Sequence, residues 1–288
     1  MKEPAVRSRP RVLPFFALLP FLIIAFGLAW SLMGLYLFAT EWAVSTFGEI
    51  SGSHPLFVLA VYSPAIAAIL LVCAYSGIGG VRLYLSRLLL WRTSVFWWLF
   101  LLFGIPAIYF AGAFVKGNAM SAPMIAEPLA AMLPVIGFMM ILGPVEELGW
   151  RGLALPLLQR KFAPVWAGLI LGLVWGIWHL PAFFLSGTPQ SAWGFTPFLI
   201  GSIAVSLILT PLFNRSGGSI ALAMLFHFQL NNPLWPDAQP YDTFFFAAAA
   251  AVIVFLNREA MFRRGSGVTE VVPPRGEQRQ PVHGAGDE

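Results

Sequence analysis

The feature that most constrains this chain is a series of long apolar stretches that recur along most of its length. A helix of roughly 20 apolar residues crosses the ~30 Å hydrocarbon core of a bilayer. Stretches of about this length fall near residues 13–39, 55–76, 94–115, 125–144, 163–186, 193–213, 217–235 and 241–257. They are continuous, as in FLIIAFGLAW, whereas β-barrel strands alternate apolar and polar residues. The sequence therefore predicts an all-α, polytopic transmembrane bundle of about eight spans.

The charged residues orient this predicted bundle. They make up only 10% of the chain, against roughly 25% in soluble domains. With eight spans and a cytoplasmic N-terminus, every Lys and Arg except Lys116 falls on one side, which the positive-inside rule assigns to the cytoplasm. Glu41, Glu49, Asp237 and Asp242 lie in the opposite loops. We therefore expect both termini to be cytoplasmic.

The composition also divides the chain and excludes some functions. Residues 1–12 are a basic N-terminus, 13–262 form the membrane domain, and 263–288 are rich in Gly, Pro and charge, which predicts a disordered cytoplasmic tail. The net charge of +4 fits attraction to anionic lipid of the inner leaflet. No basic patch is dense enough to predict nucleic-acid binding. The single cysteine, Cys73, lies within a span and predicts no disulfide.

Two adjacent acids, Glu146 and Glu147, lie in the run ILGPVEELGWRG at the end of one predicted span. Ionised groups at membrane depth are costly, so they usually face a protein interior or a wet cavity and indicate function. Pro144 favours the first turn of a new helix. On that helix Glu147 and Arg151 share a face and can pair, whereas Glu146 points elsewhere. The simpler alternative is that the acids only complement a helix dipole.

Two later spans each carry a histidine. The run VWGIWH places Trp175 four residues before His179, and LFHFQLNN places His227 four residues before Asn231, so each pair shares a helix face. Each histidine taken alone has an ordinary explanation. His179 fits an interfacial aromatic belt, and His227 fits a hydrogen bond between helices. These explanations do not account for the whole set.

An acid and two imidazoles in a confined polar cavity suit the activation of water, which indicates hydrolysis. A desolvated Glu146 can act as a general base, and a histidine with an Asn amide can stabilise an oxyanion. Glu146, His179 and His227 equally form a zinc-ligand set with an open position for water. The residues alone do not separate these two mechanisms.

At these residues the chain resembles the CPBP family of intramembrane proteases, which includes the CAAX prenyl endopeptidases and Abi-like bacteriocin-processing relatives. The family pattern is Glu-Glu-x-x-x-Arg, Phe-x-x-x-His and His-x-x-x-Asn on successive helices. Here EELGWR (146–151) and HFQLN (227–231) are intact, and WGIWH (175–179) has Trp175 in place of Phe. The resemblance covers about residues 140–235, the predicted catalytic core, and the earlier spans match by hydropathy only.

The resemblance implies an intramembrane endopeptidase in the cytoplasmic membrane of a prokaryote, with its active site toward the cytoplasmic half. Members of the family were formerly described as metalloproteases, but the resemblance favours a glutamate mechanism without metal. The amide of Asn231 agrees with this mechanism, because an oxyanion hole uses such a donor and a zinc site does not need it. We therefore favour no cofactor and retain zinc as the alternative. The implied roles are water activation by Glu146 and His179, oxyanion stabilisation by His227 and Asn231, and support from Glu147, Arg151 and Trp175. The expected substrate is a membrane-associated or lipidated peptide or protein.

Two other functions compete with proteolysis. A transporter would show related halves with paired broken helices, but the acids and histidines of the predicted core have no equivalent in 13–115. A non-proteolytic membrane scaffold or immunity protein stays open. The small residues Gly168 and Gly172 favour close packing within the bundle over dimerisation, and the sequence predicts no oligomeric state.

Overall fold

The computed structural model describes residues 13–274, and within that range every regular element is a helix. The N-terminal helices are α1 (Leu18–Phe38), α2 (Thr40–Phe47), α3 (Pro55–Val61), α4 (Ser63–Leu85), α5 (Val95–Leu99), α6 (Ile105–Lys116), α7 (Pro123–Ala126) and α8 (Leu129–Met139). The C-terminal helices are α9 (Glu147–Gly149), α10 (Leu155–Gln159), α11 (Pro164–Trp178), α12 (Phe195–Arg215), α13 (Ile220–Leu230), α14 (Asp242–Leu256) and α15 (Arg258–Phe262). The predicted all-α fold is confirmed.

The helices include six continuous segments that are long and apolar enough to cross a membrane. These segments are Phe15–Phe38, Ser63–Leu89, Val95–Lys116, Leu129–Gln159, Pro164–Phe184 and Phe195–Arg215. The shorter apolar helices α13 and α14 occupy the last two predicted positions, so the eight predicted apolar stretches all form helices. The chain is a multi-pass membrane protein.

Two segment boundaries differ from the predicted ones. The second span begins at Ser63, because residues 55–61 form the separate helix α3, which His54 caps through its side chain. The fourth span continues from Leu129 through the acids to Gln159 instead of ending at 144, because Pro144 starts a new helical turn at once. The acid pair therefore lies inside a span.

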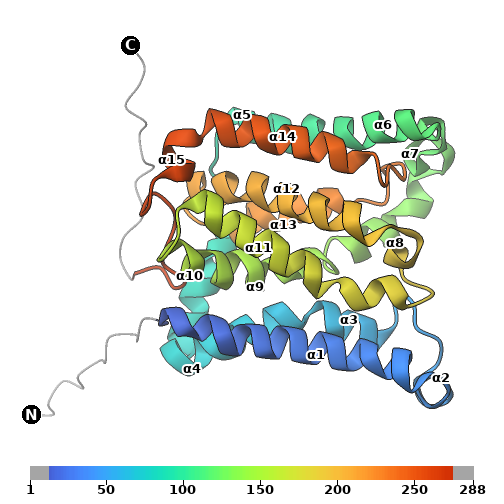
Figure 1. The fold of residues 1–288 in the computed structure, drawn as a ribbon, viewed down its shortest axis with the longest axis horizontal. Coiled ribbons are helices and arrows are strands. Elements are labelled where there is room, and N and C mark those ends of the chain that lie inside the picture. Colours follow the sequence, from blue (N-terminus) through green and yellow to red (C-terminus); the bar gives the residue numbers. More distant parts are fainter. Residues whose placement is uncertain (1–12, 275–288) are drawn as a thin grey trace, which may run out of the picture.

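The bundle is built from helices that run side by side (Figure 1). Helix α1 packs on α4, α11 on α12, α12 on α14, and α14 on α6. The two described ends of the chain lie at the same end of the bundle, at the left of Figure 1. The side chain of Arg160 joins them, since it donates to the carbonyl oxygens of Leu13 and Thr269.

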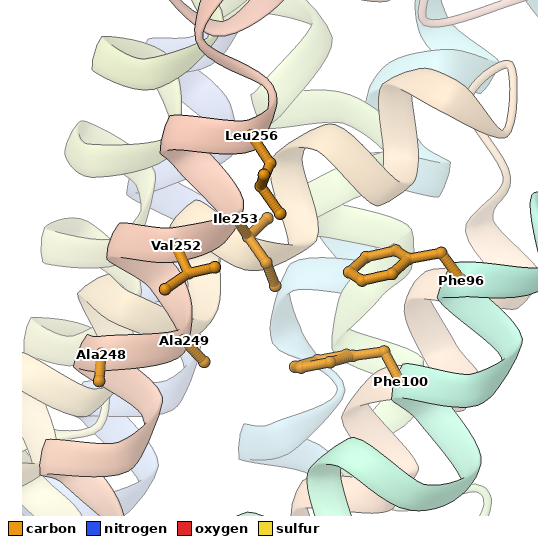
Figure 2. A pocket seen from close by; sticks show the side chains of 7 residues that line it. All are labelled: Phe96, Phe100, Ala248, Ala249, Val252, Ile253 and Leu256. Atoms are coloured by element: carbon orange, nitrogen blue, oxygen red, sulfur yellow. The ribbon is translucent and has the colours of Figure 1, made fainter.

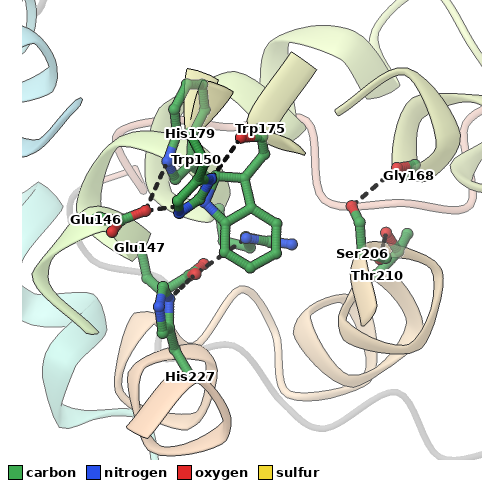
Figure 3. Close-up of polar contacts among 10 residues, drawn as sticks. Glu146, Glu147, Trp150, Gly168, Trp175, His179, Ser206, Thr210 and His227 are labelled. Carbon is green, nitrogen blue, oxygen red and sulfur yellow. Dashed lines mark hydrogen bonds and ion pairs between the residues drawn. The ribbon is translucent and has the colours of Figure 1, made fainter. Parts of the chain in front are cut away.

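Glycines bring α11 and α12 into close contact. A Cβ atom added to Gly172 would lie 2.7 Å from the Cα of Ile203. Ser206 donates a 2.8 Å hydrogen bond to the carbonyl oxygen of Gly168, and Thr210 stands beside it on the same helix (Figure 3). The small residues at 168 and 172 therefore serve packing within the chain, as predicted.

The segment after α15 differs from the predicted disordered tail. Residues 263–274 cross the ends of the helices, and Val271 is buried. Side chains of the bundle bind the main chain of Val268 and Thr269, and these side chains are Gln159, Arg160 and Asn214. We call residues 263–274 the C-terminal strap. The predicted basic N-terminus (1–12) and the rest of the predicted tail (275–288) lie outside the described residues.

A buried arginine fastens this strap to the bundle. Arg87 follows α4 in a 3-10 turn (Ser86–Leu89), and it is 3% exposed. Its guanidinium donates to the carbonyl oxygens of Gly218 at 2.8 Å, Gly152 at 3.0 Å and Val271 at 3.0 Å. Four segments that are far apart in the sequence therefore meet at one side chain.

Candidate active site

The acid pair lies where one span changes from lipid-facing to protein-facing. No residue of α8 is buried, although α8 is strongly apolar. After Gly143 the chain forms a 3-10 turn (Pro144–Glu146), α9, a π-helix (Trp150–Ala154) and α10, and nearly every residue from 144 to 159 is buried. Single π-turns inside helices are frequent at functional sites. The apolar half of this span thus faces outward, and the half that carries charge faces the other helices.

Glu147 is the centre of a buried charged cluster. Its Oε1 accepts from Arg151 at 2.9 Å, which is the pair predicted from the spacing, and it also contacts His227 Nδ1 at 2.7 Å. Glu147 and Arg151 have no exposed surface, and His227 is 3% exposed. A buried carboxylate needs such partners to offset its lost hydration. Sequence reasoning missed the contact between Glu147 and His227, which joins helices 80 residues apart.

Glu146 points away from this cluster, as predicted, but its carboxylate is not free. Its Oε2 accepts from the indole nitrogen of Trp175 at 2.8 Å and from that of Trp150 at 3.3 Å. Its Oε1 has no hydrogen-bond partner among residues 13–274, and it is not one of the enclosed atoms of that range. Sequence reasoning missed Trp150, although Trp150 stands four residues after Glu146 and so on the same helix face.

Trp175 connects the predicted site residues. Its ring centroid lies 5.4 Å from that of His179 and 5.4 Å from that of His227, and the guanidinium carbon of Arg151 lies 4.8 Å from its centroid. Figure 3 shows the Trp175 side chain among the two acids and both histidines. The residues that the sequence placed on three separate helices thus meet around one aromatic ring.

The ring nitrogens of His179 have separate partners. Nδ1 lies 2.8 Å from the carbonyl oxygen of Trp175. A carbonyl can only accept, so Nδ1 carries the proton and the neutral ring has a lone pair on Nε2. Nε2 has no hydrogen-bond partner in the described part of the chain. His179 therefore presents an acceptor on the face turned away from its own helix backbone.

His227 and Asn231 meet beside Gly143. A Cβ atom built on Gly143 would overlap Asn231 Nδ2 and lie 3.0 Å from His227 Nε2. The amide nitrogen of Glu146 bonds to the carbonyl oxygen of Gly143 at 3.0 Å, so this pair lies one helical turn from the Glu146 backbone. Only glycine leaves room here for both side chains. Sequence reasoning missed this role, for which the Gly-Pro step at 143–144 is the signal.

The zinc alternative requires three ligands around one point. Within residues 13–274 no three His, Cys, Asp or Glu side chains are placed to hold a metal ion. The engaged atoms are Glu146 Oε2 and Nδ1 of each histidine, and a histidine that binds zinc through Nε2 commonly has its Nδ1 bonded in this way. The placement of the side chains among residues 13–274 therefore disfavours zinc, whereas their hydrogen bonds are compatible with it.

An apolar groove elsewhere on the described surface has a different character. It has a volume of about 300 Å³ and lies between α14 and the segment that contains α5 and its following π-helix (Phe100–Gly104) (Figure 2). Its lining is entirely apolar, with Phe96 and Phe100 on one side and Ala249, Val252 and neighbouring residues of α14 on the other. None of the predicted site residues lines this groove.

The predicted site residues lie in a segment that matches a known protein family. Residues 128–232, which span α8 to the end of α13 and contain all seven predicted site residues, match the family described as type II CAAX prenyl endopeptidase Rce1-like. This segment is similar to that family, and the match confirms the resemblance predicted from the three motifs.

A named protein is similar to part of this chain. The chain is 27% identical over 143 residues to "CAAX prenyl protease 2" of Methanococcus maripaludis, a match that covers 46% of this chain and 53% of the relative. The chain thus spans about half the length of the relative it matches. The Rce1-like segment holds the acids, both histidines and Trp175, whereas α1 to α6 lie outside it.

Proposed function

We propose that this chain is an intramembrane endopeptidase that hydrolyses a peptide bond of a membrane-associated or lipidated peptide or protein. The observation that carries the proposal is that Trp175 contacts both Glu146 and His179, each of which keeps one acceptor, Glu146 Oε1 and His179 Nε2, without a hydrogen-bond partner among residues 13–274. A water molecule has two protons to donate, and these two acceptors match them. The Rce1-like match of residues 128–232 supports the same reaction class.

The catalytic step follows from these groups. The oxygen of the water attacks the scissile carbonyl carbon while Glu146 takes one of the water's protons. His179 orients the water through the other proton. The carbonyl becomes a tetrahedral oxyanion. When this intermediate collapses, the C–N bond breaks and the proton held by Glu146 passes to the leaving amine. Glu146 therefore returns to its starting charge.

The oxyanion needs donors at the place where its charge develops. Asn231 Nδ2 and His227 Nε2, side by side at Gly143, supply them in this proposal. Because His227 Nδ1 faces a carboxylate, Nε2 can donate only when the ring carries both protons. Glu147 balances that charge, and Arg151 balances Glu147.

The location of the reaction is part of the proposal. The side with nearly all Lys and Arg also carries both described chain ends, which supports a cytoplasmic orientation of that end in a prokaryotic inner membrane. An active site in the cytoplasmic half of the bilayer would receive segments that lie in the inner leaflet. The alternatives are zinc-dependent proteolysis by the same residues and a non-proteolytic scaffold or immunity protein.

The test is cleavage of a membrane-peptide library by the purified full chain in nanodiscs, with mass-spectrometric detection. We expect Glu146→Gln to lower kcat by about a hundredfold or more, the range of general-base catalysis, with an unchanged melting temperature. Glu259→Gln on α15 is the matched control, because Glu259 is exposed and outside the site. Wild-type and Glu146→Gln proteins that behave alike would refute the glutamate mechanism.

A further inference from the structure

The clearest feature that the mechanism leaves unexplained is the pair of indoles on one carboxylate oxygen. Glu146 Oε2 accepts two N–H bonds while Oε1 accepts none from residues 13–274. Both tryptophans are buried, and each comes from a different helical segment. A carboxylate that is fixed by one oxygen has its other oxygen in a defined direction.

We propose that Trp175, assisted by Trp150, is a positioning residue that fixes Glu146 as the water-activating base. This inference rests on the proposed function. The 2.8 Å bond from Trp175 is the stronger one, since the 3.3 Å distance from Trp150 is longer than is usual for an N–H donor. Bonds to an ionised acceptor are worth more than neutral ones.

The surroundings of Trp175 explain why it can define this geometry. Its ring contacts both histidines and lies under the guanidinium of Arg151. The ring therefore touches the Glu147–Arg151–His227 cluster while its N–H points to Glu146. Its position keeps the two adjacent acids on different partners, so that one balances charge and the other remains available to water.

The backbone of Trp175 acts on the second water partner. Its carbonyl oxygen binds His179 Nδ1 at 2.8 Å and so leaves Nε2 as the acceptor. One residue thus sets both acceptors, Glu146 through its indole and His179 through its carbonyl. A phenylalanine at this position would retain the carbonyl contact and the ring but lose the bond to Glu146.

The first measurement is spectroscopic and needs no substrate. The indole N–H resonance of Trp175 is assigned in ¹⁵N-tryptophan-labelled protein as the signal that Trp175→Phe removes. We expect this resonance to move upfield in Glu146→Gln, because a neutral amide is a weaker acceptor than a carboxylate. The indole of Trp30, which donates to the carbonyl oxygen of Trp178 at 3.0 Å, should not move. An unmoved Trp175 resonance would overturn the proposal.

The second measurement is kinetic. Trp175→Phe is expected to lower kcat by about ten- to a hundredfold, the value of a bond to a charged group, with little change in KM or melting temperature. Trp150→Phe should lower kcat less, and Trp30→Phe should leave it unchanged. Replacement of Trp175 by 3-benzothienylalanine removes the N–H at nearly constant volume, so it should reproduce the loss if the bond is responsible.

The outcomes separate this inference from the proposed function. A wild-type chain that cleaves, with a Trp175→Phe variant that cleaves equally fast, overturns the positioning role alone. A wild-type chain whose cleavage does not depend on Glu146 overturns the proposed function and the inference together. Loss of kcat in both the phenylalanine and the benzothienyl variants, with the resonance shift, supports the inference.

Discussion

Two buried arginines, Arg87 and Arg151, are held by different kinds of partners. Arg87 donates to main-chain carbonyl oxygens of Gly152, Gly218 and Val271, whereas Arg151 pairs with the side chain of Glu147. We call Arg87 with its carbonyl partners the Arg87 cluster, and it lies beside the Glu147 cluster, since Gly152 directly follows Arg151 in the chain. The Arg87 cluster joins segments that are far apart in the sequence. In the Glu147 cluster, the side chains pair with one another.

The Glu147 cluster also contains buried polar atoms that are not hydrogen-bonded to any described residue. Within residues 13–274, Glu147 Oε2 and Arg151 Nε and Nη2 are buried without a hydrogen-bond partner. Unsatisfied buried polar atoms in a native structure call for a functional or hydration explanation. The Arg87 cluster holds the strap and the helix ends, so it serves stability. The Glu147 cluster lies at the candidate site, and we expect it to serve the proposed reaction at some cost in stability.

The largest effect is expected from breaking the pair at the site. Glu147→Gln leaves Arg151 and His227 buried beside a neutral amide, and removal of one partner of a buried ion pair costs about 3–5 kcal/mol. Unfolding in mixed micelles measures this loss. Glu146→Gln is the matched comparison and should unfold like the wild type, because its indole partners can still donate to the amide oxygen. Equal stability of the two variants would contradict the division of roles between the acids.

The next effect tests the oxyanion donors without removing either of them. Gly143→Ala places a methyl group where Asn231 and His227 converge, and the loss of an oxyanion donor costs about 2.7–4 kcal/mol, or a hundredfold or more in kcat. Gly137→Ala is the control, since its added Cβ meets nothing within 4 Å. A Gly143→Ala enzyme with wild-type kcat would show that the pair at Gly143 does not contact the reacting carbonyl.

A smaller effect is expected at the strap. Arg87→Ala leaves several buried carbonyl oxygens without their donor, and each hydrogen bond to a charged group is worth about 1.5–3 kcal/mol. We expect lower stability and faster proteolytic removal of residues 263–274, with kcat of the remaining folded protein unchanged. Arg82→Ala, in the last turn of α4 and exposed, should do neither. A changed kcat in Arg87→Ala would show that the Arg87 cluster affects the reaction as well as stability.

The smallest effect is expected from metal removal. A strong zinc chelator should leave cleavage unchanged in the proposed mechanism, because Glu146 and His179 activate water without a metal. Elemental analysis of the purified protein accompanies the assay. Loss of cleavage with the chelator and recovery with zinc would instead assign Glu146, His179 and His227 to zinc.

The fold and most of the cluster were predictable from local patterns. Apolar runs predicted the helices, and the spacing of Glu147 and Arg151 predicted their pair. Contacts between distant segments were not predictable. The run VWGIWH does not predict that the Trp175 indole donates to Glu146. The residues near Arg87 do not predict that its partners lie at Gly218 and Val271.

The order of the C-terminal strap also depends on contacts between distant segments. Its composition predicts disorder, because a Gly- and Pro-rich segment buries little apolar surface of its own. The structure orders residues 263–274 through side chains that belong to other segments, chiefly Gln159, Asn214 and Arg87. Composition predicts whether a segment is ordered in isolation. It does not account for the side chains of other segments that bind it in the bundle.

The sequence by itself thus determined that this chain is a helical membrane protein with an Rce1-like segment, because hydropathy and motif spacing are properties of the local chain. Only the tertiary structure decided which acid faces which partner. Glu146 and Glu147 are chemically identical neighbours, and one helical step turns one toward two indoles and the other toward Arg151 and His227. The environment of each side chain, set by packing between distant helices, distinguishes their roles.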